Sequence, residues 1–302
     1  MSKFPAHLLQ SEAPAANFGD YFNLTKPTIT LLVIITVIPS LLLPTGAFPA
    51  LSTAFAAVIG TMFASASAAV FNQLIETSTD LQMDRTKKRS LPAGRVDKNS
   101  ALLFGSFLLI AALALLYWGT NLLATLTALA GHLFYVVIYT LWLKKRTPQN
   151  IVIGGAAGAV GPLIGWAAVS GTIALPAWLL FLIIFFWTPP HFWSLALKYK
   201  NDYAKAKIPM YPVVYGDDKT RYAMFLYSLC LLPCVVGLYF CSNAGWVYLL
   251  ASCLLTAKFI WDAGVIYFSH NNLLVMAYFR YSCLYALGVF SALAIDQLLA
   301  LH

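Results

Sequence analysis

Nine apolar runs, most of them about 18 residues or longer, dominate this 302-residue chain. A run of that length can cross the hydrocarbon core of a bilayer as a helix. The composition agrees, since 60% of the residues are hydrophobic and only 10% are charged, against about 25% in soluble domains. We therefore predict an all-α polytopic membrane protein, and neither a soluble globule nor a barrel of short alternating strands. The predicted spans are residues 27–45, 51–76, 100–119, 122–142, 149–169, 175–197, 222–241, 246–267 and 277–300.

The basic residues predict how these spans are oriented. Of the 19 lysines and arginines, 18 lie in the N-terminal segment or in alternate loops, and these all face the same side. Cytoplasmic loops carry such an excess, so we place residues 1–26 in the cytoplasm and the C-terminus in the periplasm of a bacterial cell. This bias explains the net charge of +8 without nucleic-acid binding. Five cysteines with no Cys-x-x-Cys spacing predict neither disulfides nor a zinc site.

Polar residues recur every four positions where the second span ends. They are Asn72, Glu76, Asp80 and Asp84. In a helix this spacing places side chains on one slowly turning face, about 6 Å apart along the axis. Ionisable residues inside a span indicate function, and oxygen ligands beside a substrate phosphate suit Mg²⁺. We predict an Mg²⁺ site formed by Asn72, Glu76 and Asp80, with Asp84 as a fourth catalytic residue. A solvated helix end is the alternative interpretation.

Basic residues follow this stripe directly and recur in later loops. Guanidinium and ammonium groups bind phosphate oxygens, so carboxylates beside basic side chains indicate a metal-bridged diphosphate. For the triplet at residues 144–146, a role in membrane orientation alone is equally compatible with the sequence. The residues that we expect to bind the diphosphate are Arg85, Lys88, Arg89, Lys144, Arg146 and Lys198.

An aromatic segment that contains two prolines ends the sixth span. The Pro189–Pro190 pair is expected to break the hydrogen-bond ladder of the helix and leave backbone carbonyls free, because proline has no backbone donor. His191 comes directly after this pair. Its possible functional roles are a ligand to haem iron, a general base or a hydrogen-bond donor to substrate, and the alternative is a histidine that satisfies a kinked backbone. Elsewhere, we expect His132 to pack as a polar core residue and Lys258 to pair with Asp262.

These motifs resemble those of the UbiA superfamily of intramembrane prenyltransferases, and within it the protohaem IX farnesyltransferase branch. The superfamily's Asn-x3-Asp-x3-Asp motif corresponds to Asn72, Glu76 and Asp80, with glutamate in place of the first aspartate. Residues 83–92 are similar to the superfamily's Arg-Thr-x-x-Arg-x-Leu continuation. The resemblance extends over residues 20–300. Signals of the branch are Tyr139-Thr140 with residues 144–150, residues 161–166, residues 187–193, and Tyr203 with residues 208–214.

The resemblance implies a single transmembrane prenyltransferase domain over residues 27–300, with active-site loops at about residues 77–99, 143–148 and 198–221. It implies transfer of farnesyl from farnesyl diphosphate to a vinyl group of haem B, with Mg²⁺ as cofactor and haem B as substrate. Water then adds, and haem O and pyrophosphate are the products. The implied partner is haem A synthase or a terminal oxidase assembly. The residues that the resemblance places beside haem or substrate are His191, Trp193, Asp202 and Tyr203.

Two alternatives stay open from the sequence. Superfamily members that prenylate an aromatic quinone precursor carry a second Asp-x3-Asp after the sixth span, where this chain has Lys198 and Asp202. That departure disfavours both a second metal ion and a quinone substrate. A transporter is the alternative from a different class, although its ionisable residues would lie near the middle of the membrane rather than crowd one face.

Overall fold

The architecture is helical throughout the part of the chain that the structure describes. This computed structural model describes residues 16–300, so residues 1–15 of the predicted cytoplasmic segment lie outside it. The elements are α1 (Phe18–Leu24), α2 (Pro27–Leu42), α3 (Leu51–Asp80), α4 (Lys98–Gly119), α5 (Leu122–Leu133), the π-helix η1 (Phe134–Trp142), the 3-10 turn η2 (Leu143–Lys145), α6 (Asn150–Gly158), α7 (Gly161–Ser170), α8 (Leu175–Lys198), α9 (Lys200–Lys205), α10 (Tyr211–Leu229), α11 (Leu231–Cys241), α12 (Trp246–Ser269), the 3-10 turn η3 (Asn272–Leu274) and α13 (Val275–Leu299).

The spans agree in number with the prediction. Within residues 16–300, eight segments are long and apolar enough to cross a membrane, and the bent pair of α1 and α2 makes a ninth when counted as one span. Several boundaries differ. The second span extends four residues further, to Asp80, and the ninth begins at Asn272 rather than at residue 277. The seventh begins at Tyr211 rather than at residue 222, with a kink at Gly216. The residues added to the second and seventh spans are mostly polar or charged, so hydropathy alone made the predicted spans too short.

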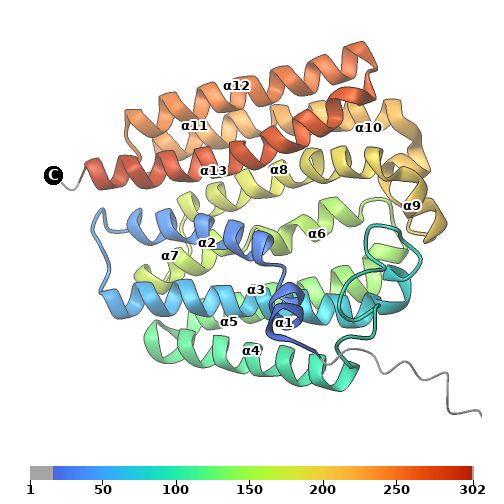
Figure 1. Ribbon diagram of the computed structural model, residues 1–302. Helices are drawn as coiled ribbons and strands as arrows, with labels where there is room; N and C mark the ends of the chain where they lie inside the picture. Colours follow the sequence, from blue (N-terminus) through green and yellow to red (C-terminus); the bar gives the residue numbers. More distant parts are fainter. Residues whose placement is uncertain (1–15, 301–302) are drawn as a thin grey trace, which may run out of the picture.

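The long helices lie roughly parallel in one bundle (Figure 1). In the first half, α3 packs against α4, α2 packs against α7 and α5 packs against α7, and small buried residues such as Ala57, Ala64 and Ala128 belong to this core. In the second half, α8 packs against α10, α11 and α13, and large aromatic residues such as Trp193 and Phe290 fill the core. The two halves therefore pack differently. In the first half, small residues leave space between the helices. In the second half, bulky residues fill the space between the helices.

The Pro189–Pro190 pair interrupts the hydrogen-bond ladder, as expected, but it does not end the helix, because α8 runs through both prolines. Both prolines are buried inside the helix. The Thr188 hydroxyl donates to the carbonyl oxygen of Ile184 at 2.8 Å, so a side chain binds the backbone next to the lost ladder bonds. Packing of α8 against α6, α10 and α13 compensates for the two missing backbone donors.

Three smaller predictions are confirmed. His132 is buried, and its Nδ1 atom lies 3.4 Å from the carbonyl oxygen of Ala64. Lys258 Nζ lies 2.6 Å from Oδ2 of Asp262, so these two residues form an ion pair within α12. All five cysteines are free thiols.

Asp296 of α13 closes one end of the bundle. Its carboxylate accepts hydrogen bonds from the backbone N–H groups of Gly245, at 2.5 Å, and Tyr248, at 3.2 Å. Gly245 is the N-cap of α12, and Tyr248 lies in the first turn of that helix. A carboxylate there satisfies donors that the helix leaves unpaired and complements its dipole. Asp296 therefore caps a helix other than its own.

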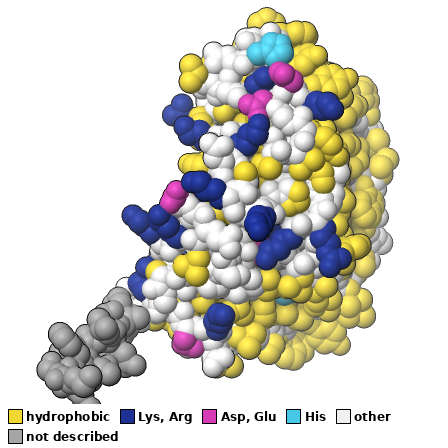
Figure 2. Space-filling model, turned by 90° about the vertical axis from the view of Figure 1, so that its right-hand side faces the viewer, with side chains coloured by type: hydrophobic (Ala, Val, Ile, Leu, Met, Phe, Trp, Pro, Cys, Tyr) yellow, Lys and Arg dark blue, Asp and Glu magenta, His cyan; other side chains and the backbone are white. Residues whose placement is uncertain are grey.

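The opposite end, where α3 finishes, carries most of the basic side chains. Figure 2 looks onto this end and shows lysine and arginine spread over it, with few acidic side chains between them. We call it the basic end. The loop after α3, the turn η2 and the short helix α9 all lie here (Figure 1).

Candidate active site

The polar stripe of α3 lies at the basic end, in the last turns of the helix. Asn72, Glu76 and Asp80 are buried, with exposed fractions of 2%, 4% and 4%. Their four-residue spacing places them along one side of the helix, as predicted. Buried carboxylates are costly unless cations or hydrogen-bond donors accompany them. The partners of these three side chains therefore define the site.

Each carboxylate of the stripe is paired with a basic residue from another segment. Lys144 Nζ lies 2.6 Å from one carboxylate oxygen of Glu76 and 2.7 Å from the other. Arg89 Nη1 lies 2.8 Å from Oδ2 of Asp80. The sequence predicted both cations as diphosphate ligands, and the structure brings both to the carboxylates. The site thus holds both signs of charge within hydrogen-bonding distance.

Lys26 and Thr140, which the sequence did not single out as site residues, hold the amide of Asn72. Lys26 Nζ donates to Asn72 Oδ1 at 2.6 Å, and Asn72 Nδ2 donates to Thr140 Oγ1 at 3.1 Å. The Thr140 hydroxyl donates to the carbonyl oxygen of Tyr135 at 2.9 Å. Because this hydroxyl has a single proton, it can only accept from Asn72. Thr140 therefore keeps the amide oxygen of Asn72 turned toward Lys26.

Lys26 reaches the stripe because the chain bends sharply before α2. Its φ of 49° lies in the left-handed region, which residues other than glycine seldom adopt, and Pro27 follows it. The axes of α1 and α2 meet there at 54°. The bend directs the Lys26 side chain toward α3. A lysine directly before the proline that begins the first span was the sequence signal for this residue.

The π-helix η1 and the turn after it supply the residues that face α3. Hydrogen bonds in a π-helix run between residues five apart, and π-helical turns occur frequently at functional sites. Tyr135, Tyr139 and Lys144 follow one another at spacings of four and five residues. The two tyrosine rings have centroids 5.3 Å apart, and Lys144 Nζ lies 5.9 Å from the Tyr139 centroid. In a regular α-helix Tyr135 and Tyr139 would share one face, but a residue five positions after Tyr139 would point about 140° away from that tyrosine.

Gly154 of α6 allows Tyr139 to pack closely beside the site. A Cβ atom at position 154 would lie 2.2 Å from Cδ2 of the tyrosine ring, so any larger residue would displace the ring. Tyr139 itself is buried, with an exposed fraction of 7%. The glycine therefore fixes an aromatic face next to Lys144 and the α3 carboxylates.

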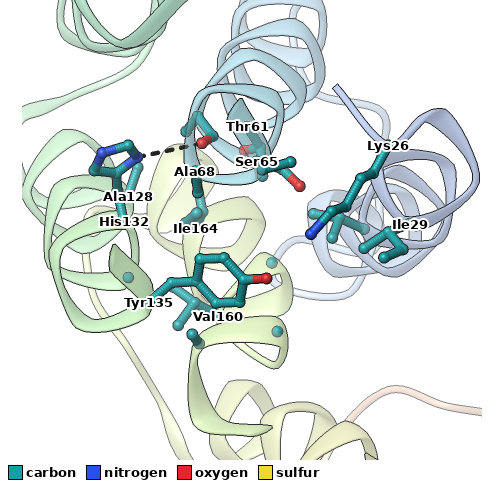
Figure 3. Close-up of a pocket in the computed structure, with 17 residues that line it drawn as sticks. Lys26, Ile29, Thr61, Ser65, Ala68, Ala128, His132, Tyr135, Val160 and Ile164 are labelled. Carbon is teal, nitrogen blue, oxygen red and sulfur yellow. Dashed lines mark hydrogen bonds between the residues drawn. The ribbon is translucent and has the colours of Figure 1, made fainter. Parts of the chain in front are cut away.

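An apolar cavity of about 100 Å³ begins beside Lys26 and Tyr135 (Figure 3). Its walls are mostly small residues of α3, α5 and α6, among them Ala64, Ala68 and Ala128. In Figure 3 the Lys26 ammonium and the Tyr135 hydroxyl both point into it. Charged groups at one end and apolar walls beyond them match a ligand with an anionic head and an apolar tail.

The other basic residues predicted to bind diphosphate lie at the surface of the basic end. Arg85, Lys88, Arg146 and Lys198 are all exposed. The Arg85 guanidinium lies 5.8 Å from the ring centroid of Tyr199. These four residues stand outside the buried stripe, whereas Arg89 and Lys144 are part of it.

Asp84 does not continue the buried stripe. Helix α3 ends at Asp80, and Asp84 lies in the following loop with 65% of its side chain exposed. It forms an ion pair with Lys87, whose ammonium group lowers the pKa of Asp84 below the ordinary value of 3.8. A four-residue period places side chains on one face only while the chain is helical, which is why the prediction failed to exclude Asp84 from the stripe.

Two of the residues predicted to contact haem belong to α8. His191 is half-buried, with its ring centroid 4.3 Å from that of Trp187 and 4.6 Å from that of Phe279. Its Nδ1 atom lies 2.5 Å from the hydroxyl of Ser282. Trp193 is fully buried in the aromatic core. The His191 ring thus packs against the rings of Trp187 and Phe279, and Trp193 lies deeper in the core of the bundle.

The other two, Asp202 and Tyr203, belong to the short helix α9 at the basic end. Tyr203 is buried and Asp202 is half-buried. Lys198 ends α8, and Tyr199 separates the two helices. Lys198 and Asp202 therefore do not lie on one continuous helix, which a second metal-binding pair at this spacing would require.

The oxygen atoms of the stripe match the ligand preference of Mg²⁺. Among residues 16–300, no three His, Cys, Asp or Glu side chains gather closely enough to hold a metal ion on their own. Mg²⁺ usually takes one or two carboxylates and completes its shell with water and substrate phosphate. Glu76 and Asp80 supply two carboxylates, and Asn72 supplies an amide oxygen. This donor set fits a cation that binds together with a phosphorylated substrate.

Fold and site together define an integral membrane enzyme for a substrate with a phosphorylated head and an apolar tail. A family model described as "UbiA prenyltransferase family" matches residues 33–291. The chain belongs to this family.

Relatives and solved structures agree with that assignment. A protoheme IX farnesyltransferase of Gloeobacter violaceus is 44% identical over 285 residues, which cover 94% of this chain and 93% of that protein. One of Leptospira biflexa is 42% identical over 276 residues, covering 91% and 97%. The resemblance seen in the sequence is therefore confirmed.

The fold recurs in solved structures of low sequence identity. A structure of digeranylgeranylglyceryl phosphate synthase has a TM-score of 0.77 at 20% identity, covering 92% of this chain and 98% of that one. A UbiA homologue from Archaeoglobus fulgidus bound to GPP and Mg²⁺ has a TM-score of 0.66 at 17% identity, covering 91% and 99%. The helical bundle is thus that of the UbiA-type membrane prenyltransferases.

Proposed function

We propose that this protein transfers the farnesyl group of farnesyl diphosphate to a vinyl group of haem B, with addition of water, so that haem O and pyrophosphate form. Relatives that carry the name protoheme IX farnesyltransferase support this reaction, since they are 42–44% identical over more than nine-tenths of the chain. They favour haem B as acceptor over the quinone precursor that the sequence left open.

The observation that carries the proposal is the position of the charged cluster at the mouth of an apolar cavity. Lys26 and Tyr135 line the cavity, and Lys26 also binds Asn72 of the stripe. A prenyl diphosphate has the same division, with charge at one end and hydrocarbon at the other. The diphosphate therefore binds at the stripe, and the farnesyl chain extends along the small residues of α3.

In the bound state the half-buried cations and the buried carboxylates bind separate partners. Lys26, Arg89 and Lys144 turn from the stripe to the phosphate oxygens, which they bind with charge-assisted hydrogen bonds. Asn72, Glu76 and Asp80 are then free to hold Mg²⁺, a cation that the A. fulgidus homologue binds together with GPP. Mg²⁺ supplies stabilisation of the negative charge that develops on the departing pyrophosphate. The exposed residues that guide the diphosphate in and out are Arg85, Lys88, Arg146 and Lys198.

Cleavage breaks the bond between farnesyl C1 and the diphosphate oxygen, and pyrophosphate leaves with the electron pair. The ring of Tyr135 lines the cavity and that of Tyr139 lies beside Lys144, so their faces stabilise the allylic cation. The vinyl group of haem B attacks C1, a carbon–carbon bond forms, and the positive charge moves to the vinyl carbon beside the porphyrin. Water adds there and releases a proton, which completes the hydroxyl group of haem O.

We assign haem contact to His191, Trp193, Asp202 and Tyr203. His191 is the best placed, because it is half-buried and its ring already stacks between Trp187 and Phe279. A porphyrin is another flat aromatic surface, so it can extend this stack over the outer face of Phe279 and reach the edge of the His191 ring. Trp193 lies deeper, against Tyr211 and Tyr227.

The chain is a multi-pass membrane protein, and we place it in the bacterial inner membrane. The basic end faces the cytoplasm, as short loops rich in lysine and arginine do, so the N-terminus is cytoplasmic and the C-terminus periplasmic. Diphosphate then binds and leaves on the cytoplasmic side. The product passes to haem A synthase or to an assembling terminal oxidase.

The test is an assay of the purified protein with haem B, farnesyl diphosphate and Mg²⁺. We expect haem O, measured by chromatography and mass spectrometry, to appear in equal amount with pyrophosphate, and chelation of Mg²⁺ to stop both. A farnesylated quinone precursor made in place of haem O would overturn the choice of acceptor. Formation of neither product by well-folded protein would overturn the assignment as a whole.

A further inference from the structure

One basic residue of the 19 lies away from the N-terminal segment and the basic loops, and it is Lys258. It lies 12 residues after the start of α12 and 11 before its end. At 1.5 Å per residue these distances are about 18 Å and about 16 Å, so Lys258 is near the middle of the span. The positive-inside bias of the loops does not explain a lysine at this depth.

Lys258 and its partner face outward. The side chain of Lys258 is 54% exposed, and that of Asp262 is 26% exposed. Their ion pair lies along the helix, and Lys258 Nζ also lies 4.4 Å from the ring centroid of Tyr281. Ionised residues at mid-membrane depth are expensive and almost always face protein or a water-filled cavity. An outward-facing pair at this depth therefore indicates a surface that protein covers.

A groove lies on the flank of α12 that faces α10, whereas Lys258 contacts Tyr281 on the flank that faces α13. Phe225 of α10 and Gly264 and Phe268 of α12 line the groove, and Trp261 forms part of its rim with 72% of its surface exposed. Gly264 has no side chain to fill the bottom of the groove, where a Cβ atom would be in van der Waals contact with the ring of Phe225 at 3.4 Å. A projecting aromatic ring and a groove able to accept one thus lie side by side. We call the surface of Lys258, Trp261, Asp262 and Gly264 the α12 face.

We infer that the α12 face binds a second copy of this chain. Under a two-fold axis, Lys258 of each copy meets Asp262 of the other, and Trp261 of each enters the groove of the other. The α12 face carries a positive and a negative charge as well as a projecting ring and a groove, so two copies of it are complementary. A face with charge of one sign would repel its copy. Helix α12 lies at the edge of the bundle, where a second bundle can approach it (Figure 1).

The test uses charge reversals that repel in like pairs and attract in unlike pairs. Two tagged forms of the full-length protein are co-expressed, extracted in mild detergent, and isolated through one tag; the other tag is then quantified. Wild type is expected to recover its copy. Lys258→Asp with itself faces four carboxylates, and Asp262→Lys with itself faces four ammonium groups, so recovery falls at least about tenfold in each. Lys258→Asp mixed with Asp262→Lys restores opposite charges and is expected to recover wild-type pairing.

Two further variants keep the result interpretable if a reversed charge prevents insertion. Lys258→Gln combined with Asp262→Asn removes both charges without adding one, and Trp261→Ala removes the ring alone; both are expected to weaken recovery. Lys145→Glu, an exposed change at the basic end, is expected to leave recovery unchanged. Failure of the mixed reversal pair, when gel filtration shows both chains folded, would overturn the inference. Wild type that recovers no copy of itself would do the same. Neither outcome depends on farnesyl transfer.

Discussion

Two groups of ionised side chains, one on α3 and one on α12, are arranged in opposite ways. On α3, the carboxylates of Glu76 and Asp80 are buried and pair with cations that come from other segments. On α12, Lys258 and Asp262 belong to one helix, lie one turn apart and remain partly exposed. The first arrangement requires the folded bundle, whereas the second requires only a helix.

The difference shows which charges the fold organises for chemistry. Burying an ion pair gains little net stability, because desolvation cancels most of the attraction. The α3 pairs are therefore better explained by what replaces them when a diphosphate and a metal ion arrive. The α12 pair can form within a single helix, because its residues are four positions apart. What needs explanation is that this pair faces outward from the bundle.

Asp80→Asn should cause the largest loss. It removes one carboxylate of the proposed metal site and leaves Arg89 without its partner. We expect haem O formation to fall by about 10³-fold, the scale of losing a group that stabilises the transition state. The measurement is initial rate per folded protein in detergent. A rate within a few-fold of wild type would remove the stripe from the mechanism.

Lys144→Gln should have the next largest effect, with Lys145→Gln as the matched control. Lys144 contacts both oxygens of Glu76, whereas its neighbour is exposed. We expect a loss of about 10²-fold in turnover. Thermal stability should also fall, because a buried carboxylate loses its counter-ion. Equal rates for the two variants would show that Lys144 serves only as an orientation signal.

Thr140→Val should change the Mg²⁺ requirement more than the rate at saturating Mg²⁺. Valine keeps the shape of threonine but cannot accept from Asn72, so the amide is free to rotate. We expect the Mg²⁺ concentration for half-maximal rate to rise about tenfold, as when a residue that orients a metal ligand is lost. Thr140→Ser keeps the hydroxyl and should restore the wild-type value. If serine behaved like valine, the hydrogen bond would not be the cause.

Neutralising the α12 pair should leave catalysis almost unchanged. Lys258→Gln with Asp262→Asn alters a partly exposed pair on another helix. We expect haem O formation per folded chain to stay within about twofold of wild type. A loss comparable to that of Lys144→Gln would contradict the distinction drawn between α3 and α12.

Asp84→Asn should have the smallest effect, although Asp84 continues the same sequence period. Its lowered pKa means that the pair with Lys87 contributes above pH 3.8 and is lost as pH falls through the folded-state pKa. The pKa of Lys87 is raised above 10.5, so its contribution disappears only as pH rises beyond that value. An exposed pair contributes little, so we expect the variant's melting temperature to differ slightly from wild type by an amount that stays constant throughout the range between, and its haem O rate to match wild type. A pH-dependent loss of rate near neutrality would place Asp84 in the site.

The sequence was sufficient for features that depend on length or on local period. Apolar runs long enough to span a bilayer identified the helices, and the i, i+4 spacing identified Asn72, Glu76 and Asp80. The same spacing included Asp84, because a sequence pattern does not show that α3 ends at Asp80.

Features that depend on tertiary contacts were not predictable. Nothing local indicates that Lys144 reaches Glu76 across 68 positions, or that Lys26 reaches Asn72 across 46. The π-helix η1 is composed of residues that would serve equally in an α-helix. The continuity of α8 through Pro189–Pro190 depends on the helices packed around it.

The carboxylate of Asp296 has a consequence for the order in which the bundle is completed. The first turn of α12 exposes backbone N–H groups that only this residue of α13 binds side-on, at Gly245 and Tyr248. During synthesis α12 enters the membrane before α13, so its leading turn lacks that acceptor until the later helix is in place. Docking of α13 is therefore the step that caps α12, and a chain that stops before residue 296 leaves the first turn of α12 without this acceptor.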